Sequence, residues 1–439
     1  MFKTVLPLSS IIALRFLGLF LVLPVISVYA MGLEGSTTTL VGVVIGGYAL
    51  TQMIFQVPFG IMSDKLGRKG TIITGLLLFA IGSTICALST DILTLLLGRL
   101  LQGAGAIGAV VTAMISDVVK EEQRSKAMAL MGGSIAGAFA IAMMAGPLIG
   151  ANFGIHTLFW ITTFIALASI VILVTKVPNA PQITHTYHDK VKMSDILFNP
   201  NLIRMNITNF LQKGLMTFAF MIIPMILLKE FHWELKELWK VYLPAMVFGV
   251  AAMGPAAVFA EKKGKFREVL VAGILFFALA YYVMGNNSSD TMFIVGVVLF
   301  FIGFNMHEPI MQSLASKFAK VHQRGMVLGI FNSFGYLGTF LGGLIGGIYF
   351  QSVPLDTIAI TIVVICLVWV ALISTMPNPS KMKLVYLSLD TYNRDKLDVL
   401  DSDSNIDEWY INDTENIVII KYHEDLTSED DIKGKLATI

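Results

Sequence analysis

About twelve stretches of the chain are long and apolar enough to cross a bilayer, which takes about 20 mostly apolar residues each. They lie at residues 8–31, 40–62, 71–90, 92–117, 126–152, 156–176, 202–228, 239–261, 268–286, 290–316, 325–351 and 356–376. Lipid offers the backbone no hydrogen-bond partner, so each stretch is expected to be a helix. The sequence therefore predicts an all-α membrane protein over most of its length.

The composition agrees with a lipid environment. Hydrophobic residues make up 55% of the chain and charged residues 14%, whereas soluble domains average about 25% charged residues. The net charge of +1 gives no sign of nucleic acid as a partner. Cys86 and Cys366 lie far apart in apolar runs and do not indicate a metal site. Because no catalytic motif or metal cluster is recognisable, we expect no catalytic residues, no cofactor and no bound metal.

Lys and Arg are distributed unevenly between the loops, and this bias sets the expected orientation. They occur in loops 63–70, 117–126, 261–268 and 317–325, and are absent from the alternate loops 32–39, 89–91, 152–156, 286–290 and 352–356. We therefore expect a multi-pass protein of the bacterial inner membrane with both termini in the cytoplasm. The outer loop 229–240 carries lysines against this rule and is interpreted as a short surface helix.

The chain contains two related halves. A proline, an acid, a glycine and a base recur at one spacing, as Pro58, Asp64, Gly67 and Arg68 and again as Pro255, Glu261, Gly264 and Lys265. Parallel repeats suit alternating access, in which two bundles rock around a site at their interface. We predict a six-helix bundle over 1–176, a polar cytoplasmic linker over 177–201 and a second six-helix bundle over 202–378.

The last part of the chain, residues 383–439, is polar and is predicted to leave the membrane. Apolar residues alternate over 384–389, which indicates a strand, and residues 407–411 and 416–420 suggest a hairpin around Asn412 and Asp413. Thr427–Asp430 is typical of a helix start. The pattern predicts a small cytoplasmic α+β domain that resembles a ferredoxin-like fold. It serves either regulation or a passive structural role.

The loop after the second span carries Gly60, Asp64, Gly67 and Arg68. Their spacing resembles the loop signature of the major facilitator superfamily. The resemblance implies a conformational latch in which Arg68 pairs with Asp64, and Asp117 at the end of the fourth span joins them. Gly67 permits the tight turn. The alternative is that the basic residues of this loop serve only to fix the orientation.

Two further segments support the same resemblance. Arg99-Leu-Leu-Gln102-Gly103 resembles the family's motif in the fourth span. The residues of the fifth span resemble a second motif, which is typical of the family's antiporters; they are Gly133, Gly146, Pro147 and Gly150. The alternative for these residues is ordinary close packing between helices. Together the motifs resemble the drug:proton antiporter branch, and within it a type whose twelfth helix is followed by a ferredoxin-like domain. The first span carries Arg15 where that branch often has an acid.

Charged side chains inside the spans are candidates for the transport site, because each costs roughly 2.5–3.5 kcal/mol to insert. Arg15, Arg99, Lys213 and Glu308 are such residues. The family resemblance implies that their four helices line a central cavity. Gln102, Asn305 and His307 are polar neighbours in the same helices. The alternative is that the charges are structural and pair with one another.

We therefore predict a secondary active transporter, a proton-coupled exporter of a small molecule that uses the proton gradient as its energy source. Glu308 is the candidate proton carrier, since a carboxylate in a dry site has a raised tendency to hold a proton. The alternatives are a proton symporter or facilitator, and a membrane sensor that signals through its C-terminal domain. Its partners are the lipid bilayer, the substrate and protons. We expect a monomer, with association through the C-terminal domain as the alternative.

Overall fold

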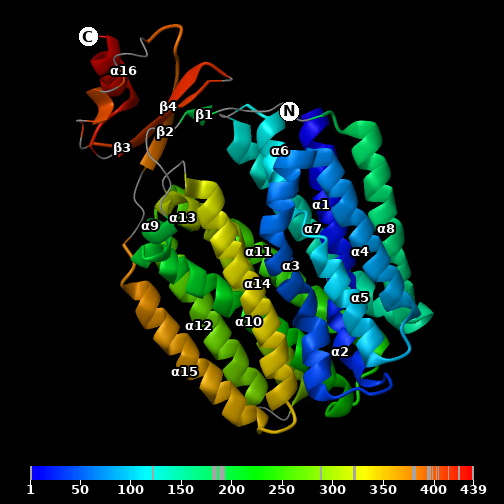
Figure 1. The fold of residues 1–439 in the computed structure, drawn as a ribbon. Helices are drawn as coiled ribbons and strands as arrows, with labels where there is room; N and C mark the ends of the chain where they lie inside the picture. The colour runs from blue at the N-terminus through cyan, green and yellow to red at the C-terminus, as the bar shows by residue number, and fades with distance from the viewer. Residues whose placement is uncertain are drawn as a thin grey trace.

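In the computed structural model two helical bundles stand side by side, and a small α+β domain lies beyond one end of them (Figure 1). The structure describes residues 2–120, 123–179, 185–186, 193–286, 289–319, 323–377, 382–392, 397, 399–401, 403, 405–413, 415–423 and 426–437. Its described part contains 12 helical segments long and apolar enough to cross a membrane. The predicted number of spans is therefore confirmed.

The first bundle contains two spans that are broken near their middle. Its helices are α1 (Phe2–Leu21), α2 (Leu23–Met31), α3 (Thr38–Leu66), α4 (Arg68–Leu88), α5 (Ile92–Ala104), α6 (Gly108–Val118), α7 (Arg124–Phe153) and α8 (Ile155–Lys176). α1 and α2 together form one span, and α5 and α6 form another. Pro24 lies at the start of α2, where a missing amide hydrogen is tolerated. α5 ends just before Gly105, whose carbonyl accepts from the Ile107 amide in the turn that leads to α6.

The second bundle repeats this order with longer unbroken helices. It contains α9 (Met193–Leu197), α10 (Pro200–Lys229), α11 (Trp239–Ala257), α12 (Phe266–Gly285), α13 (Asp290–Phe318), α14 (Arg324–Tyr349) and α15 (Leu355–Ser374). The surface segment expected within 229–240 is a short 3₁₀ turn, Leu235–Glu237. A π-helical turn, Val258–Lys262, extends α11.

The C-terminal part of the chain forms what we call the tail domain, residues 382–437. It contains β2 (Met382–Ser388), β3 (Ile406–Asn412), β4 (Ile417–His423) and α16 (Glu429–Ala437). β4 lies between β2 and β3 and is antiparallel to both, as in a ferredoxin-like split βαβ unit. The predicted hairpin near Asn412 is confirmed. α16 begins one residue later than expected, with Ser428 and Asp431 exchanging hydrogen bonds at its start.

A short strand, β1 (His185–Thr186), was not expected from the sequence. It lies in the segment predicted as a polar linker and pairs antiparallel with the edge strand β3 of the tail domain. Two extended residues next to an open sheet edge are enough for such pairing, because the edge presents free backbone donors and acceptors. Pro181 and His188 of the predicted linker lie outside the described residues.

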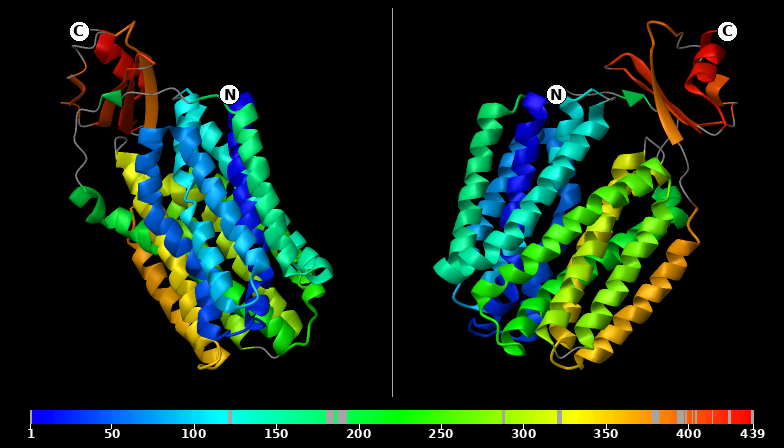
Figure 2. Two further views of the ribbon diagram at one scale, coloured as in Figure 1. Left: turned by 45° about the vertical axis from the view of Figure 1, so that its right-hand side comes forward. Right: turned by 180° about the vertical axis from the view of Figure 1, so that it is seen from behind.

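The two bundles meet at the end remote from the tail domain, which we call the far side. Figure 2 shows the helices converging there and splaying apart toward the tail domain. On the far side a Cβ atom added to Gly42 of α3 would clash with the carbonyl of Gly343 in α14. On the tail-domain side, Gly133 of α7 and Gly254 of α11 have nothing within 4 Å of such an atom. The structure is therefore closed on the far side and open on the other.

Candidate functional site

Lys213 of α10 and Glu308 of α13 form an ion pair within the second bundle. Their side chains keep 26% and 33% of their surface exposed, so the pair is half-buried inside two membrane spans. Gln212 also donates a hydrogen bond to Glu308 Oε1, at 3.2 Å. Two opposite charges that neutralise each other can stay in a membrane where a lone charge is costly.

The ion pair lies beside the aromatic residues through which the bundles touch. The Lys213 ammonium is 4.9 Å from the centroid of the Phe304 ring. Phe304 in turn packs against Phe139 of α7 in the first bundle, with centroids 6.1 Å apart. Phe139 also meets Phe220 and Phe301 at 6.4 and 6.3 Å. The ion pair therefore lies next to an aromatic contact between the two bundles.

Arg15 lies elsewhere than the sequence suggested. Its side chain is 0% exposed, and its guanidinium donates a hydrogen bond to the Gly105 carbonyl at 2.9 Å. This carbonyl follows the last residue of α5, so Arg15 caps a broken helix. In the present conformation Arg15 is enclosed within the first bundle and does not line an open cavity.

Arg99 and Gln102 are likewise enclosed, both at 0% exposure. Arg99 donates to Gln102 Oε1 at 2.8 Å and to the Val44 carbonyl at 3.3 Å, and its guanidinium stacks over the Tyr48 ring at 4.6 Å. Gln102 donates to Ser83 at 2.8 Å. These bonds join α3, α4 and α5, so the two residues hold neighbouring helices together in this conformation instead of facing the substrate path.

Asn305 and His307 are also buried, at 3% and 0% exposure. The Asn305 amide donates to the Phe301 carbonyl of its own helix at 2.8 Å. His307 Nε2 is hydrogen-bonded to the Leu270 carbonyl of α12 at 2.8 Å. Of the seven residues predicted for the cavity, only Lys213 and Glu308 are partly exposed here. The other five are turned into the bundle interiors, where each makes at least one hydrogen bond to backbone or a neighbouring side chain, while Arg15 Nε, Arg15 Nη1 and His307 Nδ1 are buried without a hydrogen-bond partner.

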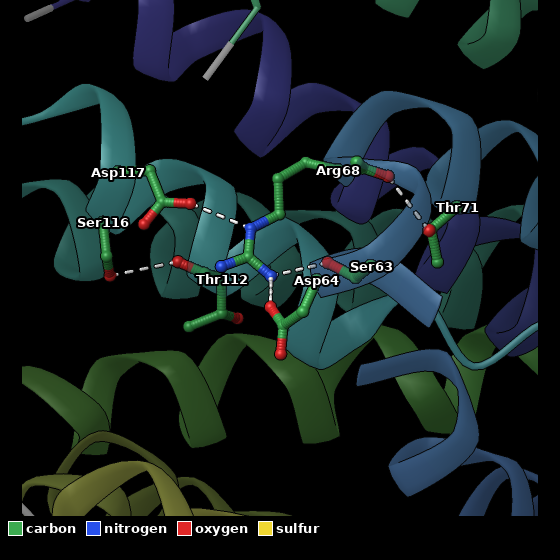
Figure 3. Close-up of polar contacts among 8 residues, drawn as sticks. Ser63, Asp64, Arg68, Thr71, Thr112, Ser116 and Asp117 are labelled. Carbon is green, nitrogen blue, oxygen red and sulfur yellow. Dashed lines mark hydrogen bonds and ion pairs between the residues drawn. The ribbon is translucent and has the colours of Figure 1, made fainter. Parts of the chain in front are cut away.

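The polar residues after α3 are brought together as expected (Figure 3). Arg68 donates to Asp64 and to Asp117, each at 2.8 Å, and to Ser63 at 2.6 Å. Gly67 has φ +86°, a conformation that glycine adopts without strain. Gly60 stands apart from this network, because a Cβ there would have nothing within 4 Å.

The second bundle contains a related contact at the equivalent loop. Glu261, which matches Asp64 in the repeat, accepts from Lys317 at the end of α13 at 2.6 Å. Ser313 donates to the same carboxylate at 2.6 Å. Both bundles therefore tie the loop after their second helix to the end of their fourth helix.

Glycines of the predicted packing motif behave differently along α7. Gly146 packs so closely on α1 that a Cβ would clash with the Leu21 carbonyl, and Gly150 faces Ile155 and Leu158. Pro147 lies between them inside the helix. Gly133 meets no neighbour in this conformation, so the close packing expected of it is absent on the open side.

The sequence analysis missed a polar bridge between the bundles. Gln52 of α3 donates to the Tyr336 hydroxyl of α14 at 2.8 Å, and Arg15 donates to the other end of the same amide at 3.3 Å. Nothing in the sequence separates Tyr336 from the other tyrosines of the chain. Its role is visible only once α3 and α14 are placed against each other.

Comparison with known proteins agrees with this architecture. The sequence pattern of the Major Facilitator Superfamily matches residues 8–268 and 245–386. The inner membrane transport protein YajR of Escherichia coli (strain K12) is 37% identical over 378 residues, covering 85% of this chain and 83% of that protein. The quinolone resistance protein NorA of Staphylococcus aureus (strain COL) is 27% identical, covering 77% of this chain and 88% of NorA.

A solved structure shows the same fold. The human organic anion transporter MFSD10 superposes with a TM-score of 0.65 at 17% identity, covering 84% of this chain and 99% of that one. The fold and its relatives define a multi-pass membrane transporter and not an enzyme. The chain belongs to the Major Facilitator Superfamily, as a transporter of the inner membrane.

Proposed function

We propose that the protein is a proton-coupled antiporter that exports a small organic molecule by alternating access. The observation that carries this proposal is the half-buried Lys213–Glu308 pair at the junction of the bundles. It holds an ionisable carboxylate against a cation within the membrane, so that a change in the protonation of Glu308 changes the net charge of the site.

The coupling follows from the charge balance of the pair. When Glu308 is ionised it neutralises Lys213, and the site carries no net charge. When Glu308 takes a proton, Lys213 is left without its counter-ion, which is costly in a low-dielectric site. A zwitterionic substrate can bind the ionised pair instead, with its cationic group on Glu308 and its anionic group on Lys213. The proton and the cationic group of the substrate therefore compete for Glu308, so that proton uptake expels the substrate, as an antiporter requires.

The surroundings favour a substrate that also has an apolar part. The Phe304 ring lies against the Lys213 ammonium, and the rings of Phe139 and Phe301 lie beyond it. Aromatic rings bury large apolar areas and stack on other rings. A small amphipathic zwitterion, with an aromatic or other apolar body, suits this setting best.

Export is supported by the orientation that the basic loops favour. We place both termini and the tail domain in the cytoplasm, so that the open side of this structure is the inner side. A transporter that opens inward can load from the cytoplasm. Relatives named for resistance, such as NorA, support the outward direction. The Arg68 network then serves as a latch near the cytoplasmic end of the first bundle.

The test uses purified protein in liposomes that contain a pH-sensitive dye. A proton gradient is imposed and pools of small organic anions and zwitterions are added. We expect substrate-evoked proton flux from the wild type and none from Glu308→Gln. The matched control is Glu237→Gln, which removes the same charge from an exposed Glu237–Lys240 pair. Proton coupling that survives Glu308→Gln would contradict the proposal, and a flux of the opposite sign would indicate a symporter.

A further inference from the structure

Lys421 of the tail domain is a buried lysine with an unusual position. It is 4% exposed, and its ammonium donates to the carbonyls of Lys317 and Ala319 at 3.4 and 3.2 Å. These carbonyls lie at the end of α13, where a helix cannot satisfy its own acceptors. A cation there also meets the negative end of the helix dipole. The tail domain thus caps a membrane-spanning helix.

This contact belongs to a packed face of the sheet. One face of β4 places Val418 and Ile420 against Ile432 of α16. The opposite face, which carries Lys421, is also buried, with Ile419 at 0% and the neighbouring Tyr410 at 3% exposure. A two-sided sheet of this kind indicates a defined docked position for the domain and not a loosely tethered one.

The same sheet also holds the connection between the bundles. β1 pairs with the edge of β3, with His185 opposite Asn412 and Thr186 opposite Ile411. β1 lies on the segment that leads from α8 of the first bundle to α9 of the second. The sheet is therefore attached at once to that connection and to the end of α13 in the second bundle.

The helix whose end Lys421 contacts, α13, also carries one residue of the Lys213–Glu308 ion pair. α13 contains Glu308, and at its end Lys317 pairs with Glu261 of the π-helical turn. Rocking of the bundles moves α8 relative to the end of α13. A sheet that binds the end of α13 and, at β1, the connection that follows α8 resists this movement.

We propose that the tail domain is a conformational clamp that stabilises the state open on the tail-domain side through the contact between Lys421 and the end of α13. Undocking it favours the state closed on that side. This inference concerns regulation, and it holds whichever substrate or ion the transporter carries.

The first measurement tests docking in the full-length protein. Spin labels are placed at Lys265→Cys beside α12 and Asp430→Cys on α16, with the buried Cys86 and Cys366 replaced by alanine. Lys421→Met keeps the length of the side chain but removes its charge and donors. We expect the distance distribution between the labels to broaden in Lys421→Met. It should stay narrow in Lys421→Arg and in Lys433→Met, because Lys433 pairs with Glu429 of its own helix, α16.

The second measurement tests the consequence for the bundles. Gly133→Cys places a thiol on the open side, where no atom lies within 4 Å. Coupling between two sites in proteins commonly amounts to about fivefold or more, and we expect Lys421→Met to slow alkylation of this thiol by at least about fivefold. Lys421→Arg should restore the rate, which separates loss of the clamp from misfolding.

Two results would overturn the proposal. One is a tail domain that stays docked in Lys421→Met, since Lys421 would then not be the anchor. The other is a domain that undocks while alkylation at position 133 is unchanged, since the domain would then be passive. Neither result depends on transport or proton flux, so the clamp and the proposed antiport are tested separately.

Discussion

The guanidinium of Arg15 and the carbonyl of Gly105 meet at the break between α5 and α6, 2.9 Å apart. α5 ends at Ala104 and α6 begins at Gly108, and in the turn between them the Gly105 carbonyl accepts from the Ile107 amide at 2.9 Å. Arg15 supplies a second, charged donor from α1. A charged residue that looks like a transport residue in the sequence thus completes the backbone of a neighbouring span.

We predict that Arg15→Met lowers stability more than it lowers transport. Loss of a buried hydrogen bond from a charged donor costs about 1.5–3 kcal/mol, and the guanidinium also packs on the Phe79 ring at 5.4 Å. Thermal unfolding of the purified protein measures the first effect and liposome flux the second. Lys213→Met is the comparison and should do the reverse. An Arg15→Met protein of normal stability that no longer transports would show that Arg15 contacts the substrate.

Sequence patterns predicted the spans because each span obeys a local rule of length and apolarity. They also predicted the Arg68 contacts, since Asp64 and Arg68 are four residues apart across one turn. They did not show which charged residues are buried inside a bundle and which stay partly exposed. Arg15 and Lys213 look alike in an apolar run, and only the packing of helices separates a capping arginine from a half-exposed lysine. Pairing of β1 with β3 is equally non-local, since it joins residues on either side of a whole bundle.

The two carboxylates bound by Arg68 are predicted to contribute unequally. Asp64 is 71% exposed and Asp117 17% exposed. Asp64→Asn should change the free energy of unfolding by about 0–1 kcal/mol, as for other exposed pairs. Asp117→Asn should cost about 1–3 kcal/mol, because Arg68 loses a less exposed partner. Thermal unfolding of both variants and of Arg68→Gln measures these values. Equal losses from the two aspartates would contradict this order.

Glycines on the far side are predicted to decide how tightly the bundles close there. A Cβ on Gly42 or Gly343 would clash with the backbone of the opposite helix, and overpacking of this kind typically costs about 1–3 kcal/mol. Gly42→Leu should therefore shift the protein toward a state open on the far side and slow alkylation at Gly133→Cys. Gly70→Leu is the control, since that position has open space around it. The idea fails if both variants alkylate at the same rate.

The packing of α16 on the rest of the tail domain is predicted to weaken in acid because of Asp403. Lys435 of α16 donates to Asp403 at 2.5 Å, and this bond, together with the Asn405 amide, lowers the pKa of Asp403 below its usual 3.8. A carboxyl whose folded pKa is depressed stabilises the fold above the unfolded pKa and loses that contribution as pH falls through the folded value. The stabilisation from ionised Asp403 is therefore lost below about pH 4.

This loss of stability can be followed by the fluorine NMR signal of Trp409, which packs on the same core, in protein labelled with 5-fluorotryptophan. Lys435→Met should remove this step and Lys433→Met should keep it; an acid transition that is identical in both variants would assign it to other carboxyls.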